Sequence, residues 1–590
     1  MLKSPNIASK TRLWVFYIFV FFVHILIIAR FFKIQILDNE KYTKRANSNY
    51  VRALSLPAPR GLILDRNGEI IVDNYPTYVL FAIGAEIIDK SKNYAIISKA
   101  TGIDTLSLIK NYKNNYRSQF IPTKIAKDLT IEQLSMLEEE KNKLSGIIYK
   151  QFPERIYHPK VKATHVLGYL KEVNQEMIDN YKIAKYSYGD LVGWAGIEKQ
   201  YESSLRGEKG VTYYQVDAFG REAGTVDTYD DLISEPGNNI NTTIDLEMQF
   251  LIEELYKDKK GAAIISKPKT GEVLAYLSSP DYDPDLFTGL VSSKDWQNVV
   301  SDPDRPLLNR VSNGLYPPGS IYKMVVAIEL LEKKLVDKEW TAHCKGEYEF
   351  YDRVHKCWDE NGHGVVNVEA AIAQSCDVYF YEAIQKVRLD NLEKRSMDFY
   401  HGVPTDIDLP SEMKGKVPNR KYMNKLYGRY GWSTGAMLNI SIGQGEVLVT
   451  PIQMAAYTNI LATRGIPKNL HLVNPKINEN VKPLSVSSKT WDIIHDSMKE
   501  VVNGKKGTGK LSNPNISGVL VSGKTGTAEN PHGETHAWYI GFADYHNKDM
   551  ISVVILVENG GGGGSIASPI ARKIFKKYNE RVNVNLARSQ

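Results

Sequence analysis

A serine and a lysine one helical turn apart, Ser320 and Lys323 in GLYPPGSIYKMVVAIELLEKK, are a candidate nucleophile and base. A serine hydroxyl attacks a carbonyl efficiently only when a nearby group takes its proton, and a neutral lysine can serve as that group. Burial and a second amine nearby would lower the pKa of Lys323 and so favour its neutral form. The chemistry expected of this pair is a covalent acyl-enzyme on Ser320.

The segment around this pair predicts a helix that begins at the serine. Pro317, Pro318 and Gly319 precede it, and a core-facing hydrophobic stripe follows at Met324, Val325, Ala327, Ile328 and Leu331. Unpaired backbone N–H groups at a helix N-terminus favour negative charge. That position suits both a serine alkoxide and the oxyanion that forms when it attacks a carbonyl.

A second candidate segment, VLVSGKTGTAEN, contains Lys524, Thr525 and Gly526. Alternating and β-branched residues predict three strands, in SGVLVSGKTGTAE, HAWYIGFADY and MISVVILVEN, and hence an antiparallel sheet. Gly523 and Gly526 lack side chains, which is typical of places where another backbone comes close. We expect an extended peptide substrate to lie along this strand.

The third candidate segment is SCDVYFYEAI, which places Ser375 and Asp377 between the helix-like stretches NVEAAIAQ and VYFYEAIQKV. Ser375 is the expected proton relay. The Ser-x-Asp or Ser-x-Asn spacing has little value alone, because Ser279, Ser293 and Ser396 also fit it. Its weight comes from its place in the chain, between the other two segments.

Two other segments repeat these patterns in poorer contexts. Ser107 and Lys110 share the serine–lysine spacing, but they lie in a polar stretch without a Pro/Gly entry, which indicates an ordinary helix surface. Lys269, Thr270 and Gly271 repeat the Lys-Thr-Gly triplet between two strand-like runs, which indicates an exposed hairpin turn. We therefore expect chemistry only at the copies around Ser320 and Lys524.

Length and composition indicate a membrane-anchored protein of several domains. The chain has 590 residues, of which 43% are hydrophobic and 24% charged, so most of it folds as ordinary soluble domains. The net charge of +6 is dispersed, and no arginine-rich helix or aromatic platform indicates nucleic-acid binding. Residues 13–32 are apolar except for His24 and Arg30 and end without a small-x-small cleavage site, which predicts an uncleaved transmembrane anchor.

The three cysteines, Cys344, Cys357 and Cys376, fall within 33 residues that also contain His363. Outside the cytoplasm the default expectation is a disulfide, most simply between Cys344 and Cys357. Three thiolates and an imidazole are also a suitable ligand set for one structural Zn²⁺ ion, and free thiols are a third alternative. The reserve ligands are Asp352 and Asp359.

Taken in chain order, Ser320/Lys323, Ser375/Asp377 and Lys524/Thr525/Gly526 resemble the three motifs of the penicillin-interacting serine acyltransferases. Upstream, LPAPRGLILDRNGEIIVDN, with Arg60, Gly61, Asp65, Arg66 and Gly68, looks like the opening box of the class B penicillin-binding proteins. The segments GWAGIEKQYESSLRG and RPLLNR also resemble that class. The GHG at 362–364, the Asp at 377 and the closing HAWYIGFA are most similar to its elongation-specific subgroup.

This resemblance implies a serine-type D-Ala-D-Ala transpeptidase or carboxypeptidase that cross-links peptidoglycan stem peptides and binds β-lactams covalently. It also implies the polymerase RodA and the scaffold MreC as partners, and no organic cofactor. The implied fold is mixed α/β (α+β), with one transmembrane helix, an elongated pedestal, and a transpeptidase domain whose central antiparallel sheet is flanked by helices. The catalytic domain would be periplasmic, on a single-pass protein of the bacterial inner membrane.

The domain boundaries expected from these features are a cytoplasmic tail at 1–12, an anchor at 13–32, a pedestal at 33–235, a transpeptidase domain at 236–578 and a tail at 579–590. Two alternatives from other functional classes are a membrane-anchored β-lactamase and a non-catalytic penicillin sensor. The first would need a positioned carboxylate to activate water, and the second would be expected to carry a signalling module.

The family mechanism assigns further roles. Ser375 and Lys524 return a proton to the leaving amine, the backbone N–H groups of Ser320 and Thr527 hold the oxyanion, and Thr525 and Thr527 bind the substrate carboxylate beside Gly526. Asp377 replaces an asparagine that in the wider class binds the substrate amide, and an ionised carboxylate can only accept hydrogen bonds. Some members of the subgroup hold zinc through Asp, Asp, His and Cys; His363 and Cys376 match the last two, and Cys344 and Cys357 replace the aspartates.

Overall fold

A computed structural model describes residues 10–42, 51–173, 177–179, 186, 190–216, 222–225, 230–287, 293–429, 432, 434–473, 482–531 and 533–588. The chain divides into two compact units. Unit 1 comprises Met1–Pro59, Pro76–Glu154 and Glu208–Pro236, and unit 2 comprises Arg60–Tyr75, Arg155–Gly207 and Gly237–Gln590.

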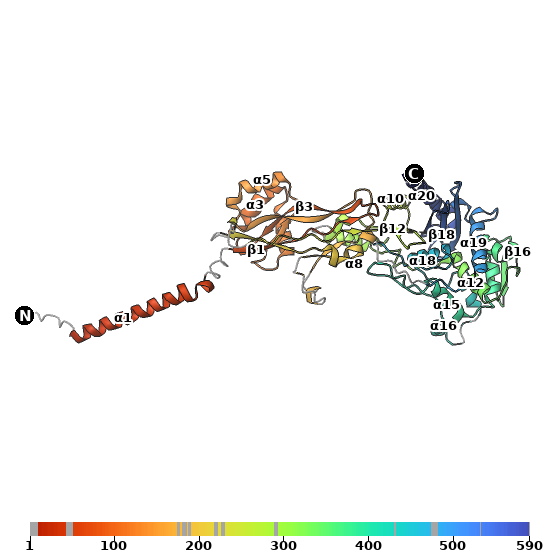
Figure 1. Cartoon of the computed structure of the whole chain (residues 1–590), viewed down its shortest axis with the longest axis horizontal. Coiled ribbons are helices and arrows are strands. Elements are labelled where there is room, and N and C mark those ends of the chain that lie inside the picture. The colour runs from red at the N-terminus through yellow and green to blue at the C-terminus, as the bar shows by residue number, and fades with distance from the viewer. Residues whose placement is uncertain are drawn as a thin grey trace, which may run out of the picture. The chain divides into compact units, whose positions relative to one another are not determined.

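The N-terminal helix α1 (Lys10–Phe32) continues into a short π-helix, η1 (Lys33–Leu37), and is drawn in red in Figure 1. Its span Arg12–Leu37 has a mean hydropathy of 2.4 and is 0% buried. A helix of this length exceeds the thickness of a bilayer core, about 30 Å, at about 1.5 Å per residue. The helix fits the single-pass membrane anchor expected from the sequence.

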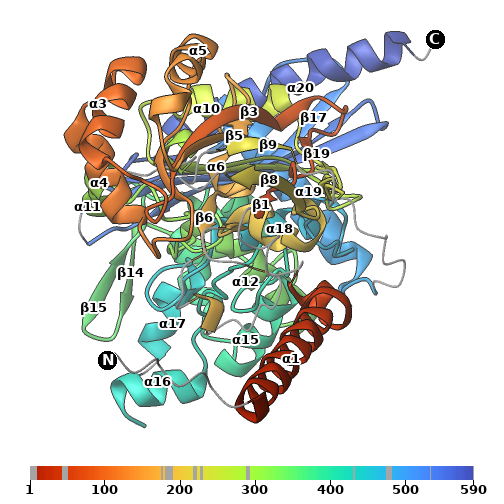
Figure 2. The same ribbon diagram turned by 90° about the vertical axis from the view of Figure 1, so that its left-hand side faces the viewer.

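After the anchor, the described residues of unit 1 form helices and strands. Helices α3 (Lys90–Thr101), α4 (Thr105–Asn115) and α5 (Ile131–Glu139) pack together (Figure 2), and each begins at a side-chain cap, Asp89, Asp104 or Thr130. The strands are β1 (Val51–Leu56), β8 (Gly210–Val216), β9 (Glu222–Thr225), β4 (Thr123–Ala126), and β3 (Ile70–Ala82) and β5 (Ile147–Tyr157), in which the chain passes between the units.

Two upstream segments that carry the family resemblance meet within unit 2. Arg60 lies 2.6 Å from a carboxylate oxygen of Glu198, on α8 (Gly196–Gln200), and 2.6 Å from one of Glu202, on α9 (Glu202–Leu205). Glu198 is fully buried, and Arg155 pairs with its other oxygen at 2.8 Å. A buried carboxylate needs such partners. The ion pairs of Glu198 therefore hold the segments of Arg60 and Arg155 against α8 in this part of unit 2.

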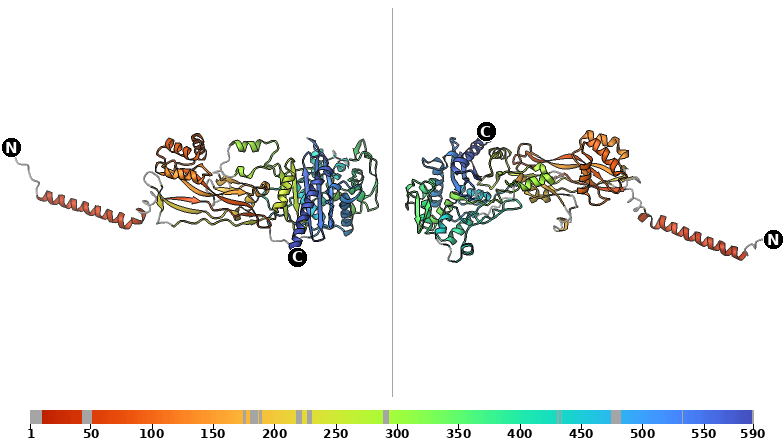
Figure 3. Two further views of the ribbon diagram at one scale, coloured as in Figure 1. Left: turned by 90° about the horizontal axis from the view of Figure 1, so that it is seen from above. Right: turned by 180° about the vertical axis from the view of Figure 1, so that it is seen from behind.

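The centre of unit 2 is an antiparallel sheet in the order β12-β11-β19-β18-β17. Its strands are β11 (Gly261–Ser266), β12 (Val273–Ser279), β17 (Val519–Ala528), β18 (His536–Tyr545) and β19 (Asp549–Val557). Helices α10 (Leu246–Leu255) and α20 (Ser568–Arg588) pack together on one face, and α18 (Pro451–Ala462) covers the other (Figures 2 and 3). The strand β17, which contains Lys524, lies at the edge of the sheet.

A helical lobe completes unit 2. Its helices are α11 (Ser293–Ser301), α12 (Lys323–Glu332), α13 (Val368–Ala373), α14 (Asp377–Ile384), α15 (Leu389–Asp398), α16 (Arg420–Tyr427), α17 (Thr434–Ser441) and α19 (Ser488–Asn503). Two small antiparallel sheets of two strands accompany them, β13 (Ala342–Cys344) with β16 (Gly364–Val366) and β14 (Glu347–Phe350) with β15 (Arg353–Lys356). The short elements near the start of unit 2 are α6 (Thr164–Leu167), β2 (Ile63–Leu64), β6 (Leu170–Glu172), β7 (Leu191–Gly193) and β10 (Ile240–Asn241).

The last helix extends beyond residue 578, into the stretch 579–590 that was predicted to be a tail. Helix α20 continues to Arg588. Arg581 makes an ion pair with the buried Asp245, and Val582 is 7% exposed and packs in the core. These contacts with an element over 300 residues earlier are not visible in the local sequence pattern.

Candidate active site

Ser320 lies where the sequence predicts it, at the start of a helix. A 3-10 turn, η4 (Gly319–Tyr322), leads directly into α12. Gly319 has a φ of +60°, and a Cβ placed there would lie 2.8 Å from the carbonyl oxygen of Thr527. The carbonyl oxygen of Pro318 would likewise lie 3.0 Å from a Cβ at Gly526. The turn carrying Ser320 therefore packs directly on β17, and glycine on both sides permits this close approach.

Helix α12 is buried on all sides over its first eight residues, so the predicted hydrophobic stripe describes only part of its contact surface. Lys323, at its first position, is fully buried and uses all three protons of its ammonium group. Its Nζ donates to Asp377 Oδ1 at 2.8 Å, to the Ser375 carbonyl oxygen at 2.8 Å and to Ser375 Oγ at 3.3 Å. The first and second candidate segments are thus in direct contact.

Lys524 reaches the same hydroxyl from the sheet. Its Nζ donates to Ser375 Oγ at 2.9 Å and to the Thr525 carbonyl oxygen at 2.9 Å, and the side chain is fully buried. The Ser375 hydroxyl is therefore hydrogen-bonded to two amines that are about 200 residues apart in the chain. The three segments singled out in the sequence converge on one oxygen atom.

The two amines differ in their electrostatic surroundings. Burial lowers the pKa of Lys524 well below that of an ordinary lysine; the positive charge of Lys323 lowers it further and Asp377 opposes the shift. Lys323 instead has a carboxylate partner, Asp377, in a salt bridge of 2.8 Å. The lowered pKa makes Lys524 a further candidate for the neutral amine.

Asp377 uses both of its carboxylate oxygens within the protein. Oδ1 pairs with Lys323, and Oδ2 accepts a hydrogen bond of 3.1 Å from the backbone N–H of Trp358. An asparagine has one side-chain oxygen and could not accept both bonds in this way with the same strength. In this chain the aspartate thus fixes the position of Lys323.

Ser375 has a strained backbone. Its φ is +58°, in the left-handed region that non-glycine residues seldom adopt. Such strain costs about 1–3 kcal/mol and persists only where the surrounding contacts enforce it, commonly at functional sites. Ser375 follows α13 and precedes α14, in agreement with the prediction that the motif joins two helices.

The predicted substrate-binding residues contact side chains and loops that sequence reasoning missed. Thr525 Oγ1 lies 2.7 Å from Thr508 Oγ1, and the Thr508 N–H donates to the Ala373 carbonyl oxygen, two residues before Ser375. The exposed Thr527 accepts a hydrogen bond at Oγ1 from the Gly563 N–H at 3.4 Å. Thr508 lies in the glycine-flanked sequence GKKGTGK, which is the only local signal for it.

The glycine run at 560–564 packs against the same strand. A Cβ at Gly563 would lie 2.3 Å from the carbonyl oxygen of Gly526, and one at Gly564 would lie 2.6 Å from that of Thr508. The run therefore needs glycine at these positions because two backbones meet there. It lies against the Lys-Thr-Gly segment.

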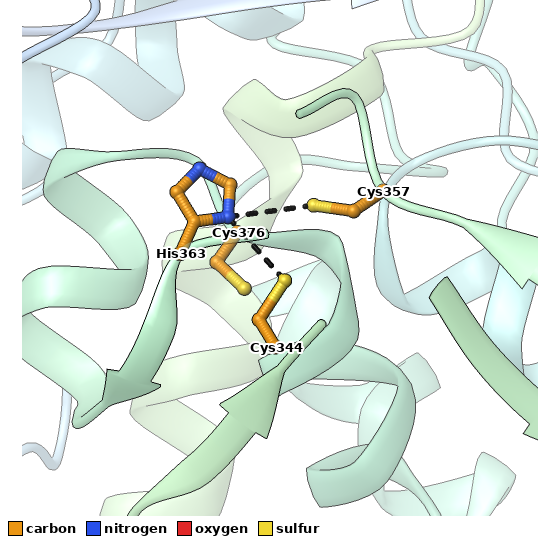
Figure 4. Close-up of side chains that lie close together, drawn as sticks. All are labelled: Cys344, Cys357, His363 and Cys376. Atoms are coloured by element: carbon orange, nitrogen blue, oxygen red, sulfur yellow. Dashed lines mark hydrogen bonds between the residues drawn. The ribbon is translucent and has the colours of Figure 1, made fainter. Parts of the chain in front are cut away.

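The cysteine cluster lies beside the second motif, as Figure 4 shows. All three cysteines are buried free thiols, so the structure differs from the alternative of a Cys344–Cys357 disulfide. The Sγ atoms of Cys344 and Cys357 lie 3.5 and 3.6 Å from Nδ1 of His363. With Cys376, the four potential ligand atoms all lie within 4.8 Å of one another. This group does not include the reserve residues Asp352 and Asp359.

The cluster has the dimensions of a tetrahedral metal site. For Zn–S of about 2.3 Å and Zn–N of about 2.0–2.1 Å, a tetrahedron places sulfur and nitrogen about 3.6 Å apart. A hydrogen bond from Cys376 lowers the pKa of the Cys357 thiol, with a further contribution from His363, and the same contact raises the pKa of Cys376. Three buried thiols so close together fit a cation that would hold them as thiolates.

Two protein families match the chain. The penicillin-binding protein transpeptidase domain matches residues 261–576, and the penicillin-binding protein dimerisation domain matches residues 55–242. The peptidoglycan D,D-transpeptidase MrdA of Haemophilus influenzae is 30% identical over 93% of this chain and 89% of its own length. The chain belongs to the penicillin-binding protein transpeptidase family.

Solved structures narrow this class. The penicillin-binding protein PBP2 of Helicobacter pylori, in its complex with MreC, superposes with a TM-score of 0.76 at 29% identity, covering 89% of this chain and 99% of that one. A chain from a peptidoglycan synthase complex that coordinates polymerisation and crosslinking has a TM-score of 0.71 at 28% identity, covering 96% of this chain and 98% of that one. Within the family the chain is of the MrdA or PBP2 type, as the motifs predicted.

Proposed function

We propose that this protein is a peptidoglycan D,D-transpeptidase that cross-links stem peptides through an acyl-enzyme on Ser320 during cell elongation. One observation carries the assignment of residues: the Ser375 hydroxyl bonds to both Lys323 and Lys524, on elements that also pack around the Ser320 turn. A chance recurrence of three short motifs would not bring their polar atoms to one buried point.

In the first half-reaction Ser320 Oγ attacks the carbonyl carbon between the two terminal D-Ala residues, and its proton passes to a neutral lysine amine. Lys524, with its lowered pKa, can accept a proton relayed through Ser375, and Lys323 is held beside the same hydroxyl by Asp377. The N–H groups of Ser320 and Thr527 would hold the oxyanion. The C–N bond then breaks, and the departing D-Ala amine takes the proton from Ser375 and Lys524.

In the second half-reaction an amine of a neighbouring stem peptide attacks the ester carbonyl. It loses a proton to the same relay, Ser320 leaves with a proton restored, and the new amide is the cross-link. Thr525, Gly526 and Thr527 would bind the donor peptide as an added strand on β17, which is a sheet edge. The carboxylate of the donor would accept hydrogen bonds from the two threonine hydroxyls.

The proposed organisation keeps a cytoplasmic tail at 1–12, an anchor at 13–32, a pedestal at 33–235 and a periplasmic transpeptidase domain from 236; residues 1–9 of the tail lie outside the described residues. Helix α1 and the match of residues 55–242 to the dimerisation domain support this order. The polymerase RodA and MreC are the proposed partners, since the matched structures include a PBP2–MreC complex and a peptidoglycan synthase complex.

For the cysteine cluster we propose one structural zinc ion, held by Cys344, Cys357, Cys376 and Nδ1 of His363. When bound, the ion would cross-link three segments and supply conformational stability. Purified full-length protein should contain about one zinc per chain, and its thiols should react with an alkylating agent only after chelation. Cys344→Ser should lose the metal, whereas His343→Ala, which changes an exposed neighbour on the same strand, should retain it. Metal-free protein with protected thiols would contradict the zinc assignment.

A fluorescent penicillin distinguishes the proposed activity from its two alternatives. A transpeptidase forms a long-lived adduct that is lost in Ser320→Ala and also cross-links a lipid-linked polymer supplied by a polymerase. Rapid turnover of the adduct would indicate a β-lactamase. A stable adduct without any cross-linking in the presence of the polymerase would indicate a sensor. The structure disfavours a β-lactamase role for Asp377, since both of its oxygens are occupied.

A further inference from the structure

Trp358 connects the cysteine cluster to both ends of the second motif. It follows Cys357 directly, and its backbone N–H donates to Asp377 Oδ2 at 3.1 Å. Its indole Nε1–H donates to the carbonyl oxygen of Gln374 at 3.0 Å. The Sγ atom of Cys357 also accepts the N–H of Asp377, at 3.4 Å. Cys357 and Trp358 thus form hydrogen bonds with Gln374, before Ser375, and with Asp377, after it.

These bonds act on the peptide planes that define the backbone of Ser375. The plane before Ser375 contains the Gln374 carbonyl, held by the Trp358 indole, and the Ser375 N–H, which donates to Ile372 at 3.2 Å. The plane after it contains the Ser375 carbonyl, held by Lys323 at 2.8 Å, and the Cys376 N–H, which donates to Ala371 at 2.9 Å. Fixing both planes fixes φ and ψ of the residue between them.

The feature of the Trp358 side chain that bears on Ser375 is its indole N–H group, not the apolar surface of its ring. Trp358 as a residue is 60% exposed, so it buries little apolar surface. A phenylalanine could occupy the same space, but it has no N–H to offer the Gln374 carbonyl. A strained backbone at φ +58° needs each such contact, because its intrinsic preference is for another region.

We propose that Trp358 is a positioning residue that, through its indole N–H, holds Ser375 in the left-handed conformation in which its hydroxyl meets Lys323 and Lys524. This inference rests on the proposed acyl-transfer function. It adds a residue from the loop of the cysteine cluster to the residues that position the catalytic groups. The conformation of that loop would then affect the proton relay through Ser375. Trp358 itself needs no contact with the substrate.

The test compares two tryptophan-to-phenylalanine changes in the full-length, detergent-solubilised protein. Trp358→Phe removes the bond to Gln374 and keeps the backbone N–H. Trp432→Phe is the matched control, because its Nε1 donates to Asn424 Oδ1 at 2.7 Å in another part of the helical lobe. Stopped-flow acylation by a chromogenic cephalosporin gives two constants, the dissociation constant of the encounter complex and the first-order acylation rate.

We expect Trp358→Phe to lower the acylation rate about 3- to 12-fold, the size of one lost hydrogen bond, and to leave the dissociation constant within about twofold. Trp432→Phe should change neither constant by more than about twofold. In a Ser375→Ala background, adding Trp358→Phe should have no further effect on the residual rate, because residues that act through one another are not additive.

Several results would overturn the inference. An unchanged acylation rate in Trp358→Phe would do so, and so would a weaker encounter complex with an unchanged rate, which would mean that the indole touches the substrate. A slower rate accompanied by loss of metal or of thiol protection would place the effect in the cluster. If wild-type protein forms no covalent adduct with the cephalosporin at Ser320, the proposed function itself is refuted. Failure of the proposed function can therefore be distinguished from failure of the inference about Trp358.

Discussion

Two segments of this chain begin a helix with the same Ser-x-x-Lys spacing, and only one of them builds a site. Ser107, near the start of α4, donates its hydroxyl proton to Asp104, and Lys110 extends into solvent. Lys323, at the start of α12, is fully buried and bonds to the second motif through three contacts. The spacing sets a distance between two side chains, whereas burial and convergence with other segments give the amine its chemistry.

The two Lys-Thr-Gly triplets show the same contrast in a sheet. Lys269 is exposed in the turn between β11 and β12, and Gly271 has a φ of +88° that the turn requires. Lys524 is fully buried in β17, and Gly526 has an ordinary φ but lies against the turn that carries Ser320. Each copy is thus a control for its partner, because the same substitution can be made in both.

The largest expected effect is at the nucleophile. Ser320→Ala should abolish the fluorescent penicillin adduct and reduce cross-linking at least about 10³-fold, since no other group can form the ester. Ser107→Ala should leave the adduct at the wild-type level and cost only its local hydrogen bond. Adduct formation followed by gel fluorescence measures both. An adduct that persists in Ser320→Ala would place the nucleophile elsewhere.

The second effect is at the amine on the sheet. Lys524→Met keeps the length of the side chain and removes the proton carrier, so acylation should fall about 10²- to 10⁴-fold, the usual range for general acid–base catalysis. Lys269→Met should change the rate by less than about twofold, because that lysine is an exposed turn residue. If both variants acylate at the wild-type rate, Lys524 has no part in the chemistry.

The glycines of the two triplets should separate activity from stability. Gly526→Ala brings a Cβ to 3.0 Å from the Pro318 carbonyl oxygen, which would displace the Ser320 turn; we expect about tenfold slower acylation with a small change in melting temperature. Gly271→Ala would place a Cβ 2.2 Å from the Asn469 carbonyl oxygen at a left-handed φ. It should destabilise the domain by about 1–3 kcal/mol without slowing acylation of the folded fraction. Equal effects of both changes on stability and rate would remove the distinction.

Local patterns in the sequence were sufficient to predict the elements that carry the motifs. Strand residues mark β17, β18 and β19, and a Pro-Pro-Gly entry before a hydrophobic run marks the start of the turn at Ser320. These predictions were confirmed because each depends on residues that are close in the chain. The resemblance to the class B penicillin-binding proteins was also confirmed. It rests on the order of the motifs along the chain, which can be read directly from the sequence.

Contacts between distant segments could not be predicted in this way. The predicted metal site places Cys357 near Cys376, but nothing in the sequence indicates that the neighbouring Trp358 bonds through its indole to Gln374, 16 residues later. The contacts of Thr508 with Thr525, 17 residues later, and with the distant Ala373 are likewise set by the fold. The left-handed backbone of Ser375 is likewise enforced by tertiary hydrogen bonds and contradicts its local preference. The salt bridge between Asp377 and Lys323 is also a property of the folded site.

The smallest expected effect is on the pH dependence of stability. In the unfolded chain Lys524 has a pKa of about 10.4, and in the folded protein burial, then Lys323, lower this pKa well below that value while Asp377 opposes the shift. Between these two pKa values the unfolded chain binds a proton that the folded protein does not, so the free energy of unfolding rises with pH, by at most about 1.4 kcal/mol per pH unit. Below the lowered pKa both states are protonated and this slope vanishes.

Denaturant unfolding at a series of pH values up to 10 should show the rise in the wild type and in Lys269→Met, and its loss in Lys524→Met. The same slope in all three proteins would mean that the folded site retains the proton on Lys524, and the base would then have to be Lys323.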